Sequence, residues 1–340
     1  MIQMPENKRN VPPVLTCLDG TDVSDSRIWY EKRRPEILEL FRSQEYGRLP
    51  DMKDVEIKIR VADSRQGMEI MEGRALRRTV EVEAIRGGNH FSFNFVVFIP
   101  VGQSRPVPAF VTICNRGIRD SDPARHFLSP FYPAETIISR GYACAAFRTQ
   151  EVAPDYDEGF STCFHKLFPE YREDRPGDAW GAITVWAWAA SRIMDYFETD
   201  PLIDEKRVAV VGHSRGERIK DIVNRFPYWF CPNYQKYKDN EEALPFDQHM
   251  LLALIAPRLV YTTSKTFDSW ADPEGQFESC VQADPVYRLL GVTGMAWREK
   301  PMPEHPLHEG RIGHHHKTGN HDMDEYDWNC FMDFADRHMK

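Results

Sequence analysis

The sequence lacks any apolar run near the roughly 20 residues that a membrane-spanning helix needs, so no membrane partner is expected. Its first 13 residues are polar and contain no apolar core of a signal peptide. It also lacks an excess of basic residues: the formal net charge is −9, which argues against a nucleic-acid partner held by phosphate contacts. With 41% hydrophobic residues, the chain has the composition of an ordinary globular protein.

Metal-ligating patterns are also scarce. The seven cysteines are scattered, with no Cys-x-x-Cys spacing and no His/Cys cluster, so zinc is not expected. His314, His315 and His316 are consecutive and cannot all face one point in regular structure. Cys114 and Cys144 lie in apolar runs and are expected to be buried thiols. We therefore predict neither a metal nor an organic cofactor.

The first third of the chain predicts a helix followed by an antiparallel lead-in. Apolar positions within 30–41 have helical spacing, and 55–61 alternates as a strand with one wet face does. Two further strand-like runs at 78–85 and 91–99 are separated by Gly87-Gly88-Asn89, a tight-turn sequence.

After this block, short apolar runs alternate with helical segments, which predicts a parallel sheet covered on both faces. Strands are expected at 108–114, 142–147, 208–211 and 258–263, and helices at 134–139, 178–196 and 326–338. Residues 1–340 are expected to form one α/β domain, because such domains often exceed the usual domain size.

The strand at 208–211 runs directly into Gly212-His213-Ser214-Arg215-Gly216, which matches Gly-x-Ser-x-Gly. In this context the serine lies on a tight strand-to-helix turn, with its hydroxyl exposed and a backbone N–H available for an oxyanion. Ser214 is the predicted nucleophile, although a plain turn at the end of a strand would give the same pentapeptide.

A nucleophilic serine needs a histidine base and a carboxylate that orients it, in the chain order Ser, acid, His. Asp268 follows the strand at 258–263, at the strand end where catalytic groups of α/β sheets collect. His321 lies in a loop before the last helix and is chosen as the base among twelve histidines.

Three further residues are candidates for oxyanion or substrate binding. Asn115 ends an inner strand beside the nucleophile. Arg215 follows the nucleophile, and a surface ion pair is its competing interpretation. Trp270 is close to the predicted acid and could stack on a sugar, with core packing as the alternative.

These motifs together resemble the glucuronoyl esterases, carbohydrate esterase family fifteen, and its bacterial branch most closely. The resemblance covers nearly the whole chain and is carried by the stretches 29–37, 212–215, 226–231, 247–250, 256–258, 270–273, 326–328 and 333–336. It implies an α/β-hydrolase fold, a three-layer sandwich with a mostly parallel central sheet. It also implies hydrolysis of 4-O-methyl-glucuronate esters that link xylan to lignin alcohols, by Ser214, Asp268 and His321. Arg215 would contribute to the oxyanion site, and Trp270 would contact the uronate.

The chain departs from the family pattern after the nucleophile. The pattern continues as a helix, a sheet strand and a Gly-rich loop with a glutamate, whereas here Gly216 is followed by a charged segment that begins at Glu217. One helix–strand unit is thus expected to be missing after Gly216, with reduced stability as a consequence. The sugar-binding lysine of the family also has no counterpart, since its spacing falls on Arg218.

Three functions remain open at this point. The first is a glucuronoyl esterase, acting on a glucuronoxylan-type ester. The second is an acetylxylan-type esterase with the same triad, favoured by the missing lysine. The third is a catalytically impaired or silent homologue. The resemblance implies a secreted or periplasmic protein, whereas the N-terminus shows no leader.

Overall fold

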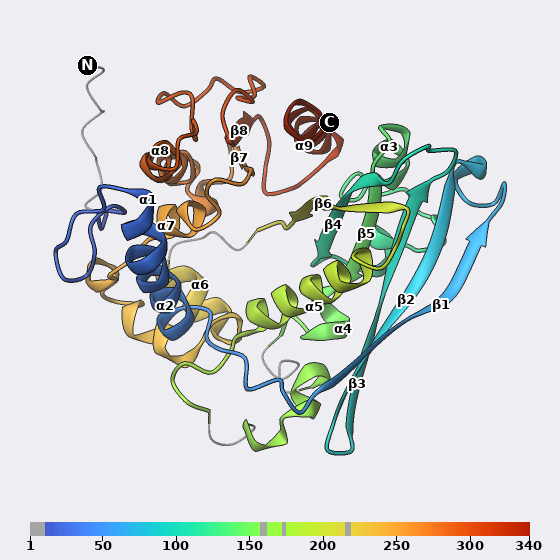
Figure 1. The fold of residues 1–340 in the computed structure, drawn as a ribbon, viewed down its shortest axis with the longest axis horizontal. Helices are drawn as coiled ribbons and strands as arrows, with labels where there is room; N and C mark the ends of the chain where they lie inside the picture. Colours follow the sequence, from blue (N-terminus) through green and yellow to red (C-terminus); the bar gives the residue numbers. More distant parts are fainter. Residues whose placement is uncertain (1–10, 157–161, 172–174, 215–218) are drawn as a thin grey trace.

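The computed structural model describes residues 11–156, 162–171, 175–214 and 219–340 (Figure 1). Its strands are β1 (Glu56–Gln66), β2 (Ala75–Arg86), β3 (Asn89–Pro100), β4 (Val107–Cys114), β5 (Ala143–Arg148), β6 (Ile203–Val211), β7 (Val260–Lys265) and β8 (Ile312–Lys317). Its α-helices are α1 (Ser26–Ile28), α2 (Arg34–Gln44), α3 (Ala134–Ser139), α4 (Thr149–Val152), α5 (Ala182–Phe197), α6 (Ile219–Arg225), α7 (Gln248–Ala253), α8 (Pro273–Leu289) and α9 (Glu325–Met339). A π-helical turn, Trp29–Arg33, joins α1 to α2, so the predicted first helix is confirmed and is longer than expected.

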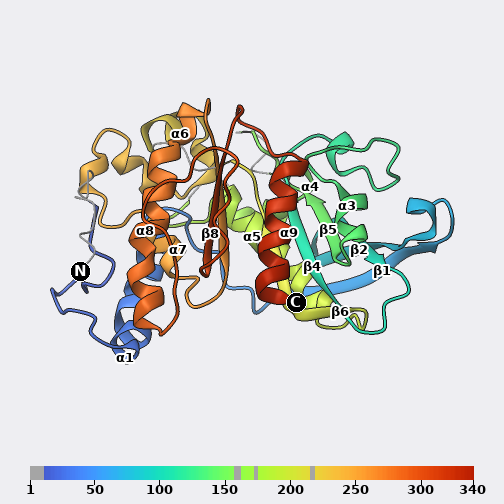
Figure 2. The same cartoon turned by 90° about the horizontal axis from the view of Figure 1, so that it is seen from above.

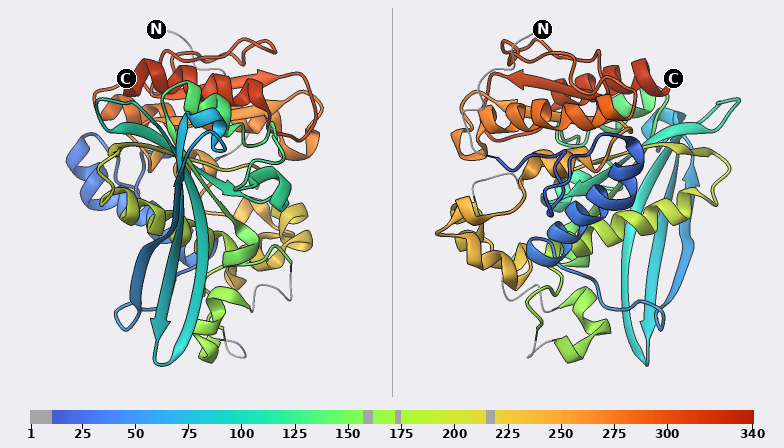
Figure 3. Two further views of the ribbon diagram at one scale, coloured as in Figure 1. Left: turned by 90° about the vertical axis from the view of Figure 1, so that its right-hand side faces the viewer. Right: turned by 60° about the vertical axis from the view of Figure 1, so that its left-hand side comes forward.

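The lead-in is antiparallel as predicted. β1 pairs with β2 and β2 with β3 along their whole lengths, and Figure 3 shows these long strands extending away from the rest of the protein. Gly87 and Gly88 connect β2 to β3 with φ of 53° and 88°, the two positive values of the tight hairpin turn that glycine favours.

The parallel part follows in the order β3-β5-β4-β6. β3 pairs with β5 antiparallel, whereas β5 and β6 both pair with β4 in parallel. β4 and β5 are buried almost throughout, and Cys114 and Cys144 are fully buried free thiols, as predicted.

β7 and β8 form a separate two-stranded parallel sheet. Alternate side chains of this sheet contact different helices. Thr262 meets Cys280 of α8, whereas Thr263 meets Asp327 of α9, so α8 and α9 cover opposite faces. Among the described residues, no strand occurs along the chain between β6 and β7, where the sequence also predicts none. In Figure 2, α9 lies between the two sheets.

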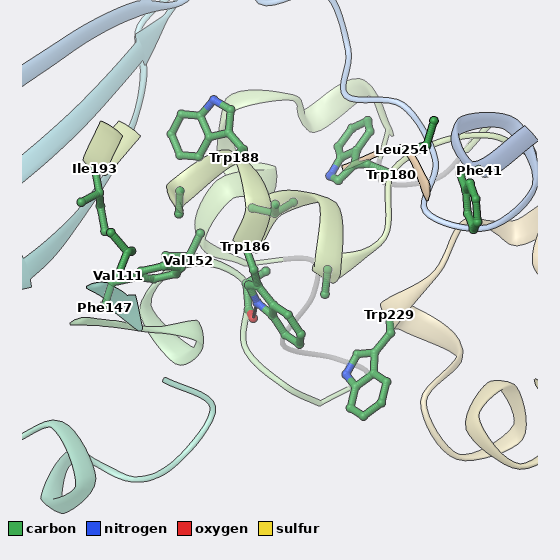
Figure 4. Close-up of a cluster of buried hydrophobic side chains, with 14 of the residues drawn as sticks. Phe41, Val111, Phe147, Val152, Trp180, Trp186, Trp188, Ile193, Trp229 and Leu254 are labelled. Atoms are coloured by element: carbon green, nitrogen blue, oxygen red, sulfur yellow. Dashed lines mark hydrogen bonds between the residues drawn. The ribbon is translucent and has the colours of Figure 1, made fainter. Parts of the chain in front are cut away.

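Aromatic side chains of α5 fill the core on one face of the larger sheet (Figure 4). Trp186 and Trp188 are almost fully buried, and the Nε1 of Trp186 donates to the carbonyl of Ala153 at 2.8 Å. The ring of Trp229 lies 6.4 Å from that of Trp186, so the segment after α6 is anchored on α5.

Two predictions about this region are wrong in detail. The helix expected from Asp178 begins at Ala182, because Trp180 and Gly181 donate their backbone N–H groups to Arg48 and Tyr46. The strand at 208–211 is not fully buried: Val210 is 63% exposed. This exposure follows from the position of β6, which is the last strand of its sheet.

Candidate active site

The turn after β6 holds Ser214 in an unusual backbone conformation. Its φ is +71°, in the left-handed region that residues other than glycine rarely adopt. Such strain persists where the surrounding structure imposes it, and a serine on a strained turn directly after a parallel strand is the geometry of a nucleophile elbow.

Asp268 and His321 are delivered by the ends of β7 and β8. The ladder between these strands reaches Lys265 and Lys317, and backbone bonds continue it into both loops. Phe267 donates its N–H to the carbonyl of Gly319 at 3.0 Å. Because parallel strands end at the same edge of a sheet, the two loops are held side by side.

The three side chains form one continuous hydrogen-bonded chain. His321 Nε2 lies 2.9 Å from Ser214 Oγ, and His321 Nδ1 lies 2.6 Å from Asp268 Oδ2. Asp268 is 9% exposed, so its carboxylate is largely shielded from water. This Ser–His–Asp arrangement at the carboxyl ends of parallel strands defines a serine hydrolase of the α/β-hydrolase class.

The other predicted residues are distributed around this chain. Asn115 directly follows β4, and its amide nitrogen donates to the carbonyl of His213 at 3.3 Å, so it contacts the turn that carries Ser214. Trp270 follows Asp268 in a short 3₁₀ turn and is 41% exposed, with the Arg225 guanidinium 5.8 Å from its ring centroid. Arg215 lies outside the described residues.

Two contacts beside His321 were not predicted from the sequence. The ring of His213 lies 4.8 Å from that of His321 and meets Phe131 edge to face. Arg116 forms an ion pair of 3.0 Å with Asp322, the residue after His321. His213 lies within the Gly-x-Ser-x-Gly match, so this motif was a signal that could have indicated it. The ion pair between Arg116 and Asp322 joins residues far apart in the chain, and no local pattern indicates it.

A buried ionic cluster lies next to the loops that carry Asp268 and His321. Lys265 Nζ donates to both carboxylate oxygens of Asp327, at 2.5 and 2.7 Å, and His315 Nε2 lies 2.7 Å from Oδ1. Burial opposes ionisation of Asp327, but the hydrogen bond from His315 and the charge of Lys265 hold the pKa of this carboxyl well below its ordinary value. The cluster fixes the first turn of α9 to the end of β7. Its β7 member, Lys265, lies three residues before Asp268.

The three consecutive histidines have separate partners, as alternation along β8 requires. His314 Nδ1 lies 2.8 Å from Thr262 Oγ1, and burial lowers the pKa of His314 to about 3. His316 Nδ1 lies 2.8 Å from Ser264 Oγ. In the described ranges, no group of three or more His, Cys, Asp or Glu side chains is placed to hold a metal ion. No helix there is long and apolar enough to cross a membrane.

A cavity of about 830 Å³ opens at the triad. Its lining includes Ser214, Asp268 and His321, and it continues between β6 and β7 along residues 206–211 and 258–265. The site is therefore continuous with the interval between the two sheets.

Comparisons with known proteins give the family. A family model described as glucuronyl esterase, fungi, matches residues 82–220 and 216–291. Carbohydrate esterase MZ0003, from an unknown prokaryotic organism, is 30% identical over 98% of this chain and 90% of its own length. The 4-O-methyl-glucuronoyl methylesterase of Schizophyllum commune is 24% identical over 83% of this chain and 74% of its own. The solved structure of a glucuronoyl esterase from Solibacter usitatus superposes with a TM-score of 0.86 at 28% identity, covering 99% of both chains.

The chain thus belongs to the glucuronoyl esterase family of carbohydrate esterases, whose members are carboxylic-ester hydrolases. The expected α/β-hydrolase fold is confirmed by these similarities. The family match consists of two pieces that overlap at residues 216–220. The alignment with the prokaryotic relative spans 400 positions, more than the 340 residues of this chain, so the relative has residues without a counterpart here.

Proposed function

We propose that this chain hydrolyses esters of 4-O-methyl-glucuronate, with a xylan-borne uronate as the acyl part and a lignin alcohol as the leaving group. The observation that carries the proposal is the hydrogen-bonded chain from Ser214 through His321 to Asp268 in a member of this family. The name of the Schizophyllum commune relative supports the choice of acyl group.

In the first half of the reaction, Ser214 Oγ attacks the carbonyl carbon of the uronate ester. His321 Nε2 accepts the hydroxyl proton and then donates it to the departing alcohol oxygen, leaving the uronyl group esterified to the serine. Water then attacks this acyl-enzyme, with His321 accepting its proton and returning it to Ser214. Asp268 holds the Nδ1–H of the imidazole, which fixes the tautomer and stabilises the imidazolium.

Substrate contacts are assigned to the three remaining predicted residues. We assign binding of the oxyanion that develops during attack to Arg215, on the family resemblance, and to the loop of Asn115, because donors to this oxygen lower the barrier most. The half-exposed ring of Trp270 would stack on the sugar, since an aromatic face suits the apolar face of a pyranose. A neutral ester is compatible with the acidic balance of the chain.

Hydrolysis of the benzyl ester of glucuronic acid tests this proposal. Ser214→Ala should lower turnover by on the order of 10⁴-fold or more, to the background rate. Ser191→Ala, on the exposed side of α5, is the matched control and should keep full activity.

Both variants and the parent must show the same folded far-UV and near-UV spectra. A folded parent chain that turns over neither this ester nor p-nitrophenyl acetate would refute the proposal and leave the silent homologue. Turnover of the acetate alone would favour the acetyl esterase.

A further inference from the structure

Ser214 and His321 belong to different sheets, so their alignment has to be maintained between two separate parts of the fold. Ser214 follows β6 of the larger sheet, and His321 follows β8 of the smaller one. In the described part of the chain, no backbone ladder joins the two sheets. A misplacement of about 1 Å between reacting groups can cost about 100-fold in rate. A side-chain contact that links the two loops beside the reacting atoms would therefore affect catalysis directly.

Arg116 makes such a contact. Its Nη2 donates to Oδ1 of Asp322, the residue after His321, at 3.0 Å. The two partners are 206 positions apart in the chain, so the bond connects the segment after β4 to the loop after β8. It is thus a direct link between the two parts of the fold, one residue away from the base.

The arginine end of this link is fixed to the turn that carries the nucleophile. β4 pairs with β6 in parallel, so the two strands end at the same edge of the larger sheet. Just beyond that edge, Asn115, the neighbour of Arg116, donates its amide N–H to the carbonyl of His213 at 3.3 Å. His213 precedes Ser214 directly. Arg116 and the nucleophile are therefore held in one unit.

A second contact orders the guanidinium. Its central carbon lies 5.1 Å from the centroid of the Phe131 ring, within the range in which a cation is attracted to an aromatic face. Phe131 is itself fixed: it is 3% exposed, and its carbonyl accepts a hydrogen bond from Trp328 Nε1 at 2.9 Å. Because the ring already orders Arg116, the ion pair costs less side-chain entropy than a typical surface pair does.

The aspartate end acts on the backbone of the loop that carries the base. Asp322 Oδ1 accepts the N–H of Met323 at 2.8 Å in addition to the bond from Arg116. Met323 is 2% exposed, so the carboxylate is oriented by a buried residue of its own loop. The ion pair therefore restrains the backbone beside His321, and not only a mobile side chain.

The exposure of the pair argues against a purely structural role. The side chains of Arg116 and Asp322 are 37% and 64% exposed. Exposed ion pairs add little to folding stability, because water and salt screen them. What this pair can change is the position of the loop relative to the nucleophile.

We propose that Arg116 is a positioning residue for the catalytic base. Through Asp322, it keeps the imidazole of His321 directed at Ser214 Oγ, and it takes no part in the proton transfer itself. The inference rests on the triad of the proposed function, but not on the identity of the ester.

Kinetics on the benzyl ester of glucuronic acid test the role. Arg116→Ala should lower kcat roughly three- to tenfold, the effect of losing one exposed ion pair and one cation–π contact, with KM and the urea midpoint unchanged. Arg116→Lys should recover most of the loss, because an ammonium can replace the single bond to the carboxylate.

Arg192→Ala is the matched control. Arg192 pairs with Asp195 at 2.9 Å and lies over the ring of Trp188, so it makes the same two kinds of contact. It belongs to α5, whose last turns lie at the start of β6, away from Ser214. This variant should keep full activity.

A double-mutant cycle tests whether Arg116 acts through Asp322. Asp322→Asn keeps an oxygen for Met323 but removes the charge, and it should lower kcat roughly two- to fivefold. Added to Arg116→Ala, it should cause no further loss, because both changes break the same ion pair. Losses that multiply would overturn the proposal. A raised KM with unchanged kcat in Arg116→Ala would also overturn it, since Arg116 would then be a substrate contact.

Reaction with diisopropyl fluorophosphate separates this proposal from the choice of ester. Ser214 Oγ bonds to phosphorus, fluoride leaves and His321 accepts the serine proton, and mass spectrometry follows the adduct. Arg116→Ala should slow this reaction by about the same factor as kcat, and equal rates for variant and parent would refute the positioning role. A parent that reacts here but not with the glucuronate ester would contradict the proposed function alone. A parent whose Ser214 does not react would overturn both.

Discussion

Glu45 offers a sharp test of how this fold treats a buried charge. It follows α2 directly and is 1% exposed, with Gln248 Nε2 at 3.1 Å from its Oε1. Burial raises the pKa of this carboxyl from 4.5 to about 8, and its hydrogen bonds with Tyr46 and Gln248 offset only part of that. Glu45 is therefore mostly protonated at neutral pH.

The sign of the pH effect follows from linkage. A raised pKa means that the folded state binds the proton more tightly than the unfolded chain, so the stabilisation is complete below pH 4.5 and is lost as pH rises through about 8. At 1.36 kcal/mol per pKa unit, the whole effect is about 5 kcal/mol. Between pH 5.5 and 7.5 the loss is roughly 2–3 kcal/mol.

Glu45→Gln removes this titration and keeps the shape of the side chain. The free energy of unfolding of the variant, relative to the parent, should rise by roughly 2–3 kcal/mol between pH 5.5 and 7.5 in urea titrations. Other titrating groups cancel in this difference because both proteins contain them. Glu198→Gln, at an exposed position, should show no such change. A constant difference between Glu45→Gln and the parent across this range would refute the reasoning.

Two further substitutions probe the triad and its support. Asp268→Asn should lower kcat for the glucuronate ester on the order of 10⁴-fold, because asparagine favours the wrong tautomer of His321. The urea midpoint should not change. A loss of activity below tenfold would contradict this role of Asp268. Asp327→Ala leaves the Lys265 ammonium buried without its carboxylate and should cost about 3–5 kcal/mol in urea unfolding. Adding Lys265→Met to Asp327→Ala should recover much of that loss, and a double variant no more stable than the single one would speak against the ion pair as the cause.

The parts of the fold that could be predicted from sequence are those where one local rule dominates. The alternation of apolar and polar residues predicted β1, and two glycines able to adopt positive φ predicted the hairpin between β2 and β3. The continuous apolar run of β4 gave a buried strand. The grouping of Ser214, Asp268 and His321 in one hydrogen-bonded chain was predicted for a similar reason, since their chain order and their places after strands are local features. Their catalytic roles stay predictions.

β8 was missed because its sequence does not look like a strand. Three of its six residues are histidines, and the strand is buried nonetheless. Each histidine is satisfied by a neighbour distant in sequence: Thr262 for His314, Asp327 for His315 and Ser264 for His316. Because burial of polar groups depends on such partners, no local pattern reveals it. α8 was missed since it contains Pro285, which usually ends a helix.

The interrupted sheet raises the question of how Ser214 and His321 stay within hydrogen-bond distance. Ser214 follows β6, whereas His321 follows β8, and in the described residues no strand joins the two sheets. α9 supplies the connection. Its first turn is fixed to β7 through Asp327, and one residue later Trp328 Nε1 donates to the carbonyl of Phe131 at 2.9 Å.

The same helix continues along the larger sheet. The ring of Trp328 meets Phe110 of β4 edge to face at 5.7 Å, and Tyr142 donates its hydroxyl proton to Asp336 at 2.5 Å. α9 therefore contacts both sheets through fully buried side chains, Asp327 toward one and Trp328 toward the other. The position of His321 relative to Ser214 depends on this helix, so the triad is retained where the hydrogen-bond ladder of the sheet is broken.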